Sequence, residues 1–302
     1  MSNHVLEGKN AAITIDLHEE DDPYDIAYCH EWLQNAGVPA TFFIPTMLLK
    51  QTRFKQVIAS LNNWEHELGT HSHCHDADEI EALKSNDIKK LKFLTVSKYC
   101  FEDFFGFSPK SFRSPAWCQL GSSALNELAW LDYAVDSSST PQRMGIFSSY
   151  PRENPFIFTR RIPYLINETI LEIPTSTFIF PFASPSFQTF RFWGSMIFLV
   201  FFLVESKLNS NVVINVQFHP GDFSPNGLDY PKPRIKLQDF LPKTPGGIKA
   251  KFWIRERNRK KISRITHSLI NNLTSARFNT LYQLYNKIVD KIPGEYITQP
   301  VY

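Results

Sequence analysis

The chain has 302 residues, of which 43% are hydrophobic and 21% charged, and its formal net charge is +2. These proportions are ordinary for a soluble globular protein, and so small a charge argues against nucleic acid as a partner. The four cysteines are scattered without a CxxC pair, which argues against a disulfide framework. Residues 1–10 are polar and lack the apolar segment of a signal peptide, so we expect a cytoplasmic protein.

Short apolar runs typical of strands alternate along the chain with segments of helical periodicity. The predicted strands are residues 11–17, 40–45, 67–70, 111–113, 133–136, 171–174, 211–219 and 277–281. The predicted helices are residues 24–36, 54–62, 87–105, 122–129, 195–207 and 262–273. This alternation predicts an α/β fold in one domain, with a parallel sheet closed into a barrel.

Two segments depart from this ordinary composition. Residues 190–204 are strongly apolar, but Arg191 interrupts them and the unbroken part is too short to span a bilayer. Residues 243–264 form a basic insertion around Phe252-Trp253-Ile254. A buried helix and a solvated helix face are the simplest interpretations. The alternative is a peripheral contact with anionic lipid at the inner membrane face.

Polar side chains follow or end five of the predicted strands. They are Asp16, His71, Arg113, Asp136 and His219. In parallel α/β barrels, catalytic groups gather at the C-terminal ends of the strands. We therefore interpret these five residues as parts of one site.

Residues 71–75 read His-Ser-His-Cys-His, so that His71 and His75 are four residues apart. On one helical turn this spacing places two ring nitrogens on one face, where they can share a metal ion. Neutral imidazoles and a carboxylate on Zn²⁺, with an open position for water, form a hydrolytic centre. The acidic run at residues 16–22 is the expected source of the third ligand.

A hydrolase also needs a base and an acid. Asp16 beside the metal suits the base, and His219 at the end of an apolar strand suits the acid. We expect Arg113 to hold Asp16 in place through a bidentate ion pair. Trp117 offers a flat apolar face of the kind that sugar rings need.

In this order, the segments resemble the motifs of the polysaccharide deacetylase family (NodB-homology domain, carbohydrate esterase family 4) over about residues 11–284. Thr14-Ile15-Asp16 is similar to the first motif, residues 67–75 to the second and residues 112–117 to the third. Asp136-Ser137-Ser138 resembles the fourth motif, and residues 217–220 resemble the fifth. The resemblance implies a NodB-like, distorted (β/α) barrel of about seven parallel strands.

The resemblance also implies a reaction. A divalent metal, Zn²⁺ in the first place, would assist hydrolysis of an N-acyl group, in particular acetyl, from an amino sugar. The N-acetylated saccharide would belong to a bacterial surface glycan or its lipid-linked precursor. Two alternatives stay open, namely a degenerate barrel that binds glycan without turnover and a related amidohydrolase acting on a non-sugar amide.

Carried over to this chain, the family's roles fall on named residues. Asp16 is the base that Arg113 steadies, and His219 is the general acid. The N–H of Ala116 helps to bind the oxyanion, and Trp117 and Asp136 lie at the substrate. His71 and His75 are metal ligands. Because Leu17 stands where the family has its metal-binding Asp, the third ligand is either His18 or Glu19.

Overall fold

The computed structural model describes residues 9–141, 160–166, 169–178, 180–208, 212–225, 236–237, 242–243, 247–248 and 250–291. Its centre is a sheet of nine strands within these residues. They are β1 (Asn10–Asp16), β2 (Ala40–Ile44), β3 (Glu67–Thr70), β4 (Ser111–Phe112), β5 (Val135–Asp136), β6 (Tyr164–Ile166), β7 (Ile170–Glu172), β10 (Ile214–Phe218) and β13 (Arg277–Phe278).

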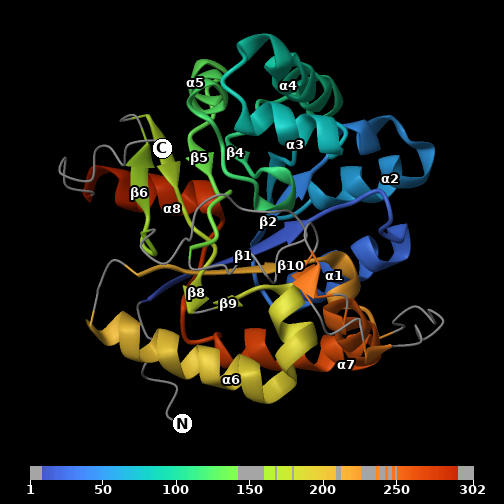
Figure 1. The fold of residues 1–302 in the computed structure, drawn as a ribbon, viewed down its shortest axis with the longest axis vertical. Coiled ribbons are helices and arrows are strands. Elements are labelled where there is room, and N and C mark those ends of the chain that lie inside the picture. The colour runs from blue at the N-terminus through green and yellow to red at the C-terminus, as the bar shows by residue number, and fades with distance from the viewer. Residues whose placement is uncertain are drawn as a thin grey trace.

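Eight α-helices in the described ranges surround this sheet (Figure 1). They are α1 (Pro23–Asn35), α2 (Thr52–Leu61), α3 (Ala77–Lys84), α4 (Lys92–Phe105), α5 (Ser122–Trp130), α6 (Ser184–Leu208), α7 (Ala250–Asn272) and α8 (Leu281–Ile288). Two short antiparallel ribbons lie outside the main sheet. They are β8 (Thr177–Phe178) with β9 (Phe180–Pro181), and β11 (Pro242–Lys243) with β12 (Gly247–Ile248).

The parallel part of the sheet has the strand order β10-β1-β2-β3-β4-β5-β7, so the prediction of about seven parallel strands is confirmed. β6 adds an antiparallel edge to β7, and β13 pairs with the start of β1. The sheet curls into a half-barrel. Within the described residues no strand ladder joins β7 to β10. The prediction that the sheet closes into a barrel is therefore wrong in this detail.

Residues 173–178 and 180–183 lie at the gap between the two ends of the half-barrel. The N–H of Ser176 donates to the carbonyl of Asn215 at 2.9 Å, and the N–H of Gln217 donates to the carbonyl of Phe182 at 3.2 Å. A few isolated hydrogen bonds therefore replace a regular ladder, which leaves the barrel distorted.

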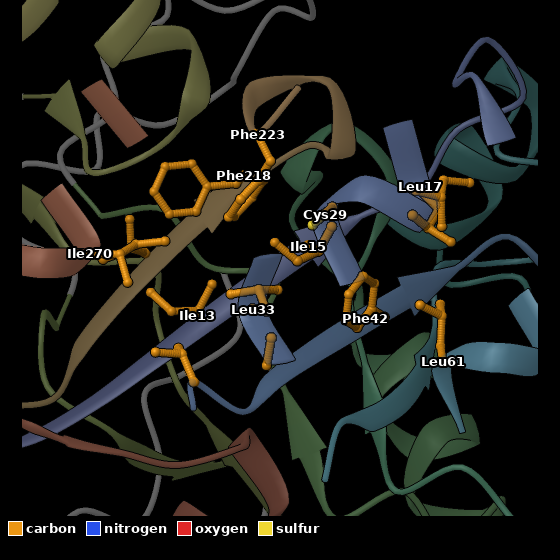
Figure 2. Packing of buried hydrophobic residues seen from close by; sticks show 14 of the residues in the cluster. Ile13, Ile15, Leu17, Cys29, Leu33, Phe42, Leu61, Phe218, Phe223 and Ile270 are labelled. Atoms are coloured by element: carbon orange, nitrogen blue, oxygen red, sulfur yellow. The ribbon is translucent and has the colours of Figure 1, made fainter. Parts of the chain in front are cut away.

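β1 separates an apolar layer from a polar interior because side chains alternate along a strand. Ile13, Ile15 and Phe218 belong to the large buried cluster between the sheet and its outer helices (Figure 2). Thr14 and Asp16 point the other way and bond to Arg113 inside the half-barrel. The same alternation that builds the core therefore delivers polar groups to one interior surface.

Local capping explains two differences from the predicted elements. The side chain of Asp87 accepts the N–H of Lys89 at 3.0 Å, which starts a 3₁₀ turn over Ile88–Leu91 before α4, in place of one helix from residue 87. Likewise, the hydroxyl of Thr280 accepts the N–H of Gln283 at 3.3 Å and starts α8, so β13 ends earlier than predicted. Helix α3 was not predicted.

Helices α6 and α7 are both longer than predicted and pack against each other. Leu199 of α6 and Ile262 of α7 enter the same core cluster as β1, so the two helices share one side of the sheet. The predicted basic insertion at residues 243–264 lies partly outside the described residues, namely at 244–246 and 249. Among the helices of the described chain, none combines the length and hydrophobicity that a membrane crossing requires.

Gly69 sets the distance between β3 and β4 beneath the histidine loop. A Cβ at this position would lie 2.6 Å from the carbonyl oxygen of Ser111 and 3.1 Å from the ring of Phe43. We expect Gly69→Ala to lower the free energy of unfolding by about 1–3 kcal/mol, because strand backbone must shift to accept the methyl group. Urea denaturation measures this, with Gln56→Ala on the exposed face of α2 as the control. Equal losses in the two variants would contradict the packing described.

Candidate metal centre and active site

Three imidazoles converge above the C-terminal ends of β1 and β3. His18, His71 and His75 each offer a ring nitrogen, and these three atoms lie within 4.8 Å of one another. The ring centroids of His18 and His71 are each 4.7 Å from that of His75. Of the two candidates for the third ligand, the structure therefore brings His18 into the cluster.

Glu19 lies outside this cluster. Its side chain is exposed and accepts a hydrogen bond from Nε2 of Gln51 at 3.1 Å. The guanidinium of Arg53 also bonds to the backbone carbonyl of Glu19. In the described geometry, the carboxylate is thus engaged beside α2, away from the histidines.

The expectation that His71 and His75 share one helical turn is wrong. Residues 71–76 form a loop between β3 and α3, in which Ser72 has a φ of 69° and His75 a φ of 61°. Left-handed backbone at two non-glycine residues folds the loop back on itself. The two rings meet through this reversal, so the four-residue spacing pointed to the right pair for the wrong reason.

All three histidines are electrically neutral at neutral pH, as metal ligands must be. Burial lowers the pKa of His71 to about 3, although the charge of Asp16 acts in the opposite direction. Burial is likewise the main reason that the pKa of His18 lies well below its usual value, with the charges of His219, His75 and His71 adding to it. Burial also lowers the pKa of His75.

Hydrogen bonding fits this donor set to a metal. Nδ1 of His71 bonds to the carbonyl oxygen of Arg113 at 2.8 Å, which makes Nδ1 the protonated nitrogen and leaves Nε2 as the ligand atom. Nε2 of His75 is buried, and no hydrogen-bond partner for it exists among the described residues. A buried ring nitrogen without a partner is unfavourable by about 1–3 kcal/mol, and a bound cation would satisfy it.

Asp16 is held next to this cluster by Arg113. Nη1 of Arg113 lies 2.7 Å from Oδ1 of Asp16, and the same nitrogen donates to the hydroxyl of Thr14 at 2.9 Å. Nε and Nη2 bond instead to the carbonyl and hydroxyl of Ser137, at 2.9 and 2.8 Å. The expected ion pair exists, but it uses one guanidinium nitrogen and is not bidentate.

Asp16 is ionised at neutral pH. Burial by itself raises the pKa of this carboxyl group, but the Arg113 guanidinium and, after it, His71 and His219 outweigh burial and bring the pKa below its usual value. The second oxygen, Oδ2, accepts a hydrogen bond from Nε2 of Gln217 at 3.2 Å. A fixed carboxylate able to accept a proton thus lies beside the histidines.

His219 lies next to His18, with 4.9 Å between the two ring centroids. Its backbone N–H donates to Oδ2 of Asp222 at 2.8 Å, and its Nδ1 lies 3.9 Å from the same oxygen. The side chain is 31% exposed, so it can meet a molecule that enters the site. Nε2 of Gln217, 3.3 Å from Nε2 of His219, links this ring to Asp16.

The predicted oxyanion segment has an unusual backbone. Ala116 and Trp117 are both left-handed, with φ of 52° and 51°. Such conformations in non-glycine residues are unfavourable by about 1–2 kcal/mol each and concentrate at functional sites. Ser114 supports the turn, because its carbonyl accepts the N–H of Trp117 and its hydroxyl donates to the carbonyl of Cys118. Trp117 is only 9% exposed, which leaves little ring surface for a sugar.

Asp136, predicted to lie at the substrate, is buried. Its carboxyl group accepts the hydroxyl of Ser138 at 2.5 Å and shares a hydrogen bond with Glu172. Burial raises the pKa of both acids, and for Glu172 the neighbouring Asp136 raises it further. The pair therefore has its hydrogen bonds to neighbouring residues, since Glu172 also accepts the N–H of Ser139 at 3.1 Å.

Gln217 and Asp222 join the site although neither was predicted. Gln217 is two residues before His219, so strand alternation places both side chains on one face, and this was a usable signal. Asp222 is buried and meets His219 through the 3₁₀ turn over Pro220–Asp222, which spacing alone does not reveal.

Comparison with known proteins identifies the fold. No family model and no curated protein matches the sequence. Among solved structures, a candidate polysaccharide deacetylase from Mycobacterium smegmatis matches with a TM-score of 0.59 at 17% identity, over 97% of this chain and 96% of that one. The fold is that of the polysaccharide deacetylases. At this identity the likeness establishes the fold alone.

Two further structures are more distant. A peptidoglycan N-acetylglucosamine deacetylase matches at a TM-score of 0.49 and 14% identity, over 93% of this chain and 90% of that one. A carbohydrate esterase family 4 pseudoenzyme from Bacillus anthracis matches at 0.48 and 12%, over 93% of this chain and 66% of that one. Scores below 0.5 add nothing to the assignment of the fold.

The buried charge pair predicts a large loss of stability when one partner is removed. Arg113→Met would leave Asp16 charged and without its counter-ion, which is unfavourable by about 3–5 kcal/mol. The matched control is Lys110→Met, which removes a cation paired with Asp132 at the surface and should cost less than about 1 kcal/mol. Urea denaturation at pH 7 measures both. Similar small losses in the two variants would show that Arg113 does not neutralise Asp16.

Proposed function

We propose that the protein is a metal-dependent hydrolase that removes an N-acyl group, in particular acetyl, from an amino sugar. One observation carries this proposal. Three neutral imidazoles converge between an ionised carboxylate and a partly exposed histidine, and Nε2 of one of them is buried without a hydrogen-bond partner among the described residues. A metal site flanked by a proton acceptor and a proton donor is an arrangement suited to metal-dependent amide hydrolysis. The deacetylase fold is consistent with it.

In this proposal His18, His71 and His75 hold the metal. When bound there, a Zn²⁺ ion supplies Lewis acidity toward the amide carbonyl and lowers the pKa of water. Glu19 has no role in the site that we propose.

The chain's own groups move the protons. Asp16 accepts a proton from the attacking water, whose oxygen bonds to the acyl carbon, and Arg113 keeps the carboxylate oriented. His219, in its protonated form, donates to the amine nitrogen as the carbon–nitrogen bond breaks, so the products are a carboxylic acid and a free amine. Gln217, which contacts both Asp16 and His219, holds the two groups at a fixed separation.

Metal content tests the first part of the proposal. We expect about one Zn²⁺ per chain by elemental analysis, and loss of acetate release from N-acetylated saccharides when a chelator removes the ion. His75→Gln should abolish stoichiometric binding. His73→Gln is the matched control from the same loop, because His73 bonds to the hydroxyl of Thr46 at 2.8 Å and lies outside the cluster. Protein without metal and with no response to a chelator would favour the glycan-binding alternative.

Acetate release from a panel of saccharide and non-saccharide amides tests the reaction. Asp16→Asn should lower kcat by about 10²- to 10⁴-fold while leaving the zinc content unchanged, because it removes the proton acceptor and keeps the ligands. Activity on non-sugar amides alone would favour the other amidohydrolase. An active Asp16→Asn variant would remove Asp16 from the mechanism.

A separate observation bears on the lipid-linked form of the substrate. Leu199 and Phe202 of α6 face the core, and yet the opposite face of the same helix is also apolar. Its exposed residues are Ile197, Val200, Phe201, Val204 and Leu208. Lys207, Lys261 and Arg264 are exposed on α6 and α7. Lys207 is on the same helix as this stripe, and the other two cations are on α7, which packs against α6. We propose that this face contacts an anionic membrane surface, since exposed cations on these two helices would attract acidic headgroups.

Vesicle co-sedimentation tests the contact. The protein should sediment with vesicles that contain anionic phospholipid and not with neutral vesicles, and high salt should release it. Phe201→Ser with Val204→Ser should weaken binding about tenfold, through loss of apolar contact. Val96→Ser with Tyr99→Ser, two exposed residues of α4, is the control. Equal sedimentation of all forms, or of none, would refute the contact.

A further inference from the structure

Glu79 is a buried carboxylate that no step of the proposed reaction uses. It is 6% exposed and lies in the first turn of α3, where its own N–H donates to the side chain of the N-cap Asp76 at 2.9 Å. A carboxylate in the first helical turn usually reaches back to the N-cap. The carboxylate of Glu79 reaches further, into the loop that carries the metal ligands.

Consecutive donors of this loop converge on the carboxylate. Oε2 accepts the backbone N–H groups of His73 and His75, at 3.3 and 2.9 Å, and the hydroxyl of Ser72 at 2.6 Å. The N–H of Cys74 donates to both oxygens, at 2.9 and 3.0 Å. Successive N–H groups that point at one place form a concave anion-binding nest, and here the anion is a side chain of the same chain.

The loop needs such a partner because its backbone is strained. Ser72 and His75 both have positive φ, and each conformation is unfavourable by about 1–2 kcal/mol for a residue with a Cβ. Hydrogen bonds from the N–H groups of Thr46 and Met47 to the carbonyls of Ser72 and His73 hold the carbonyl side of the loop. Within the described part of the chain, Glu79 is the one side chain that accepts the N–H groups of His73, Cys74 and His75.

We propose that Glu79 is a positioning residue, which holds the loop in its reversed conformation and thereby sets His75 against His71 for metal binding. This role rests on the proposed function for the identity of the metal site. The hydrogen bonds that Glu79 accepts come from backbone N–H groups and a hydroxyl of the loop, not from the ring nitrogens of the histidines. It acts by removing the alternative loop conformations that would otherwise compete with metal binding.

Three measurements on Glu79→Gln test the role. Gln keeps the size of the side chain but replaces one acceptor oxygen with an NH₂ group, which cannot accept the loop's N–H groups. In metal-free protein, we expect hydrogen exchange in a peptide covering residues 70–78 to become at least tenfold faster. Zn²⁺ affinity, from competition with a chromophoric chelator, should fall about 10- to 100-fold, the usual effect of losing a group that orients a ligand. The visible spectrum of the Co²⁺ form should change as well, because the ligand geometry changes.

Glu81→Gln is the matched control. Glu81 lies on the same helix and is exposed, so this variant removes the same charge near the metal without touching the loop. It should change Zn²⁺ affinity less than threefold. Ser72→Ala removes one donor and leaves the three N–H donors, so its exchange rate and Zn²⁺ affinity should fall between those of wild type and Glu79→Gln. This variant tests the role if Glu79→Gln does not fold.

The outcomes separate this role from the proposed function. Unchanged exchange in Glu79→Gln would overturn the role of Glu79 in the loop. Faster exchange with unchanged Zn²⁺ affinity would overturn its positioning of the ligands. A wild-type protein that binds no Zn²⁺ would overturn the proposed function and the positioning role together, while the exchange measurement would still decide whether Glu79 holds the loop.

Discussion

A guanidinium buried inside the half-barrel must be neutralised and hydrogen bonded on every side, and this constraint organises the site. Arg113 is fully buried, and the effective penalty for desolvating such an ion is several kcal/mol unless its donors are satisfied. Thr14 and Asp16 of β1 take one nitrogen, and Ser137 after β5 takes the other two. One side chain thus ties together the ends of three strands. Since His18 lies two residues after Asp16, the same contacts also position a candidate metal ligand.

The interior around Arg113 and Asp16 is polar because the inward-pointing residues of the strands are themselves polar. Thr14, Asn215 and Gln217 all point inward, and each finds a partner within the half-barrel. Asn215 donates to the carbonyls of Ile173 and Pro174, in the segment that crosses the gap between β7 and β10. Polar groups here do what a strand ladder does in a closed barrel. The open, irregular side of the sheet and the polar interior are therefore two aspects of one arrangement.

The two halves of the candidate site differ in how they are held. Asp16, Arg113 and Gln217 belong to strands or follow them directly, and their positions depend on sheet register. His71 to His75 lie in a loop whose conformation depends on hydrogen bonds to Glu79 and to the segment after β2. In the proposed function, such a site combines a rigid proton acceptor with metal ligands whose geometry depends on a single carboxylate.

The elements that sequence predicts best are those with buried, strongly patterned strands. β1, β2, β3 and β10 form where apolar runs predict them, and their polar ends do meet, because register and alternation are local consequences of the pattern. The elements that were predicted wrongly also have local causes. α3 begins at an Asp cap after the histidine loop, and Asp87 divides the predicted long helix. Such hydrogen bonds compete with periodicity and are not visible in it.

By itself, the sequence determined the chemistry of the site: which residue types stand at the ends of which strands, and that two histidines, an aspartate and an arginine would meet. Tertiary structure alone decided how they meet. His18 rather than Glu19 joins His71 and His75, since Glu19 turns toward Gln51. The histidine loop takes a left-handed path that no helical spacing describes, because Glu79, several residues further on, satisfies its N–H groups. Spacing along a chain specifies neighbours only while the backbone is regular, and beyond that, hydrogen bonds between distant residues decide.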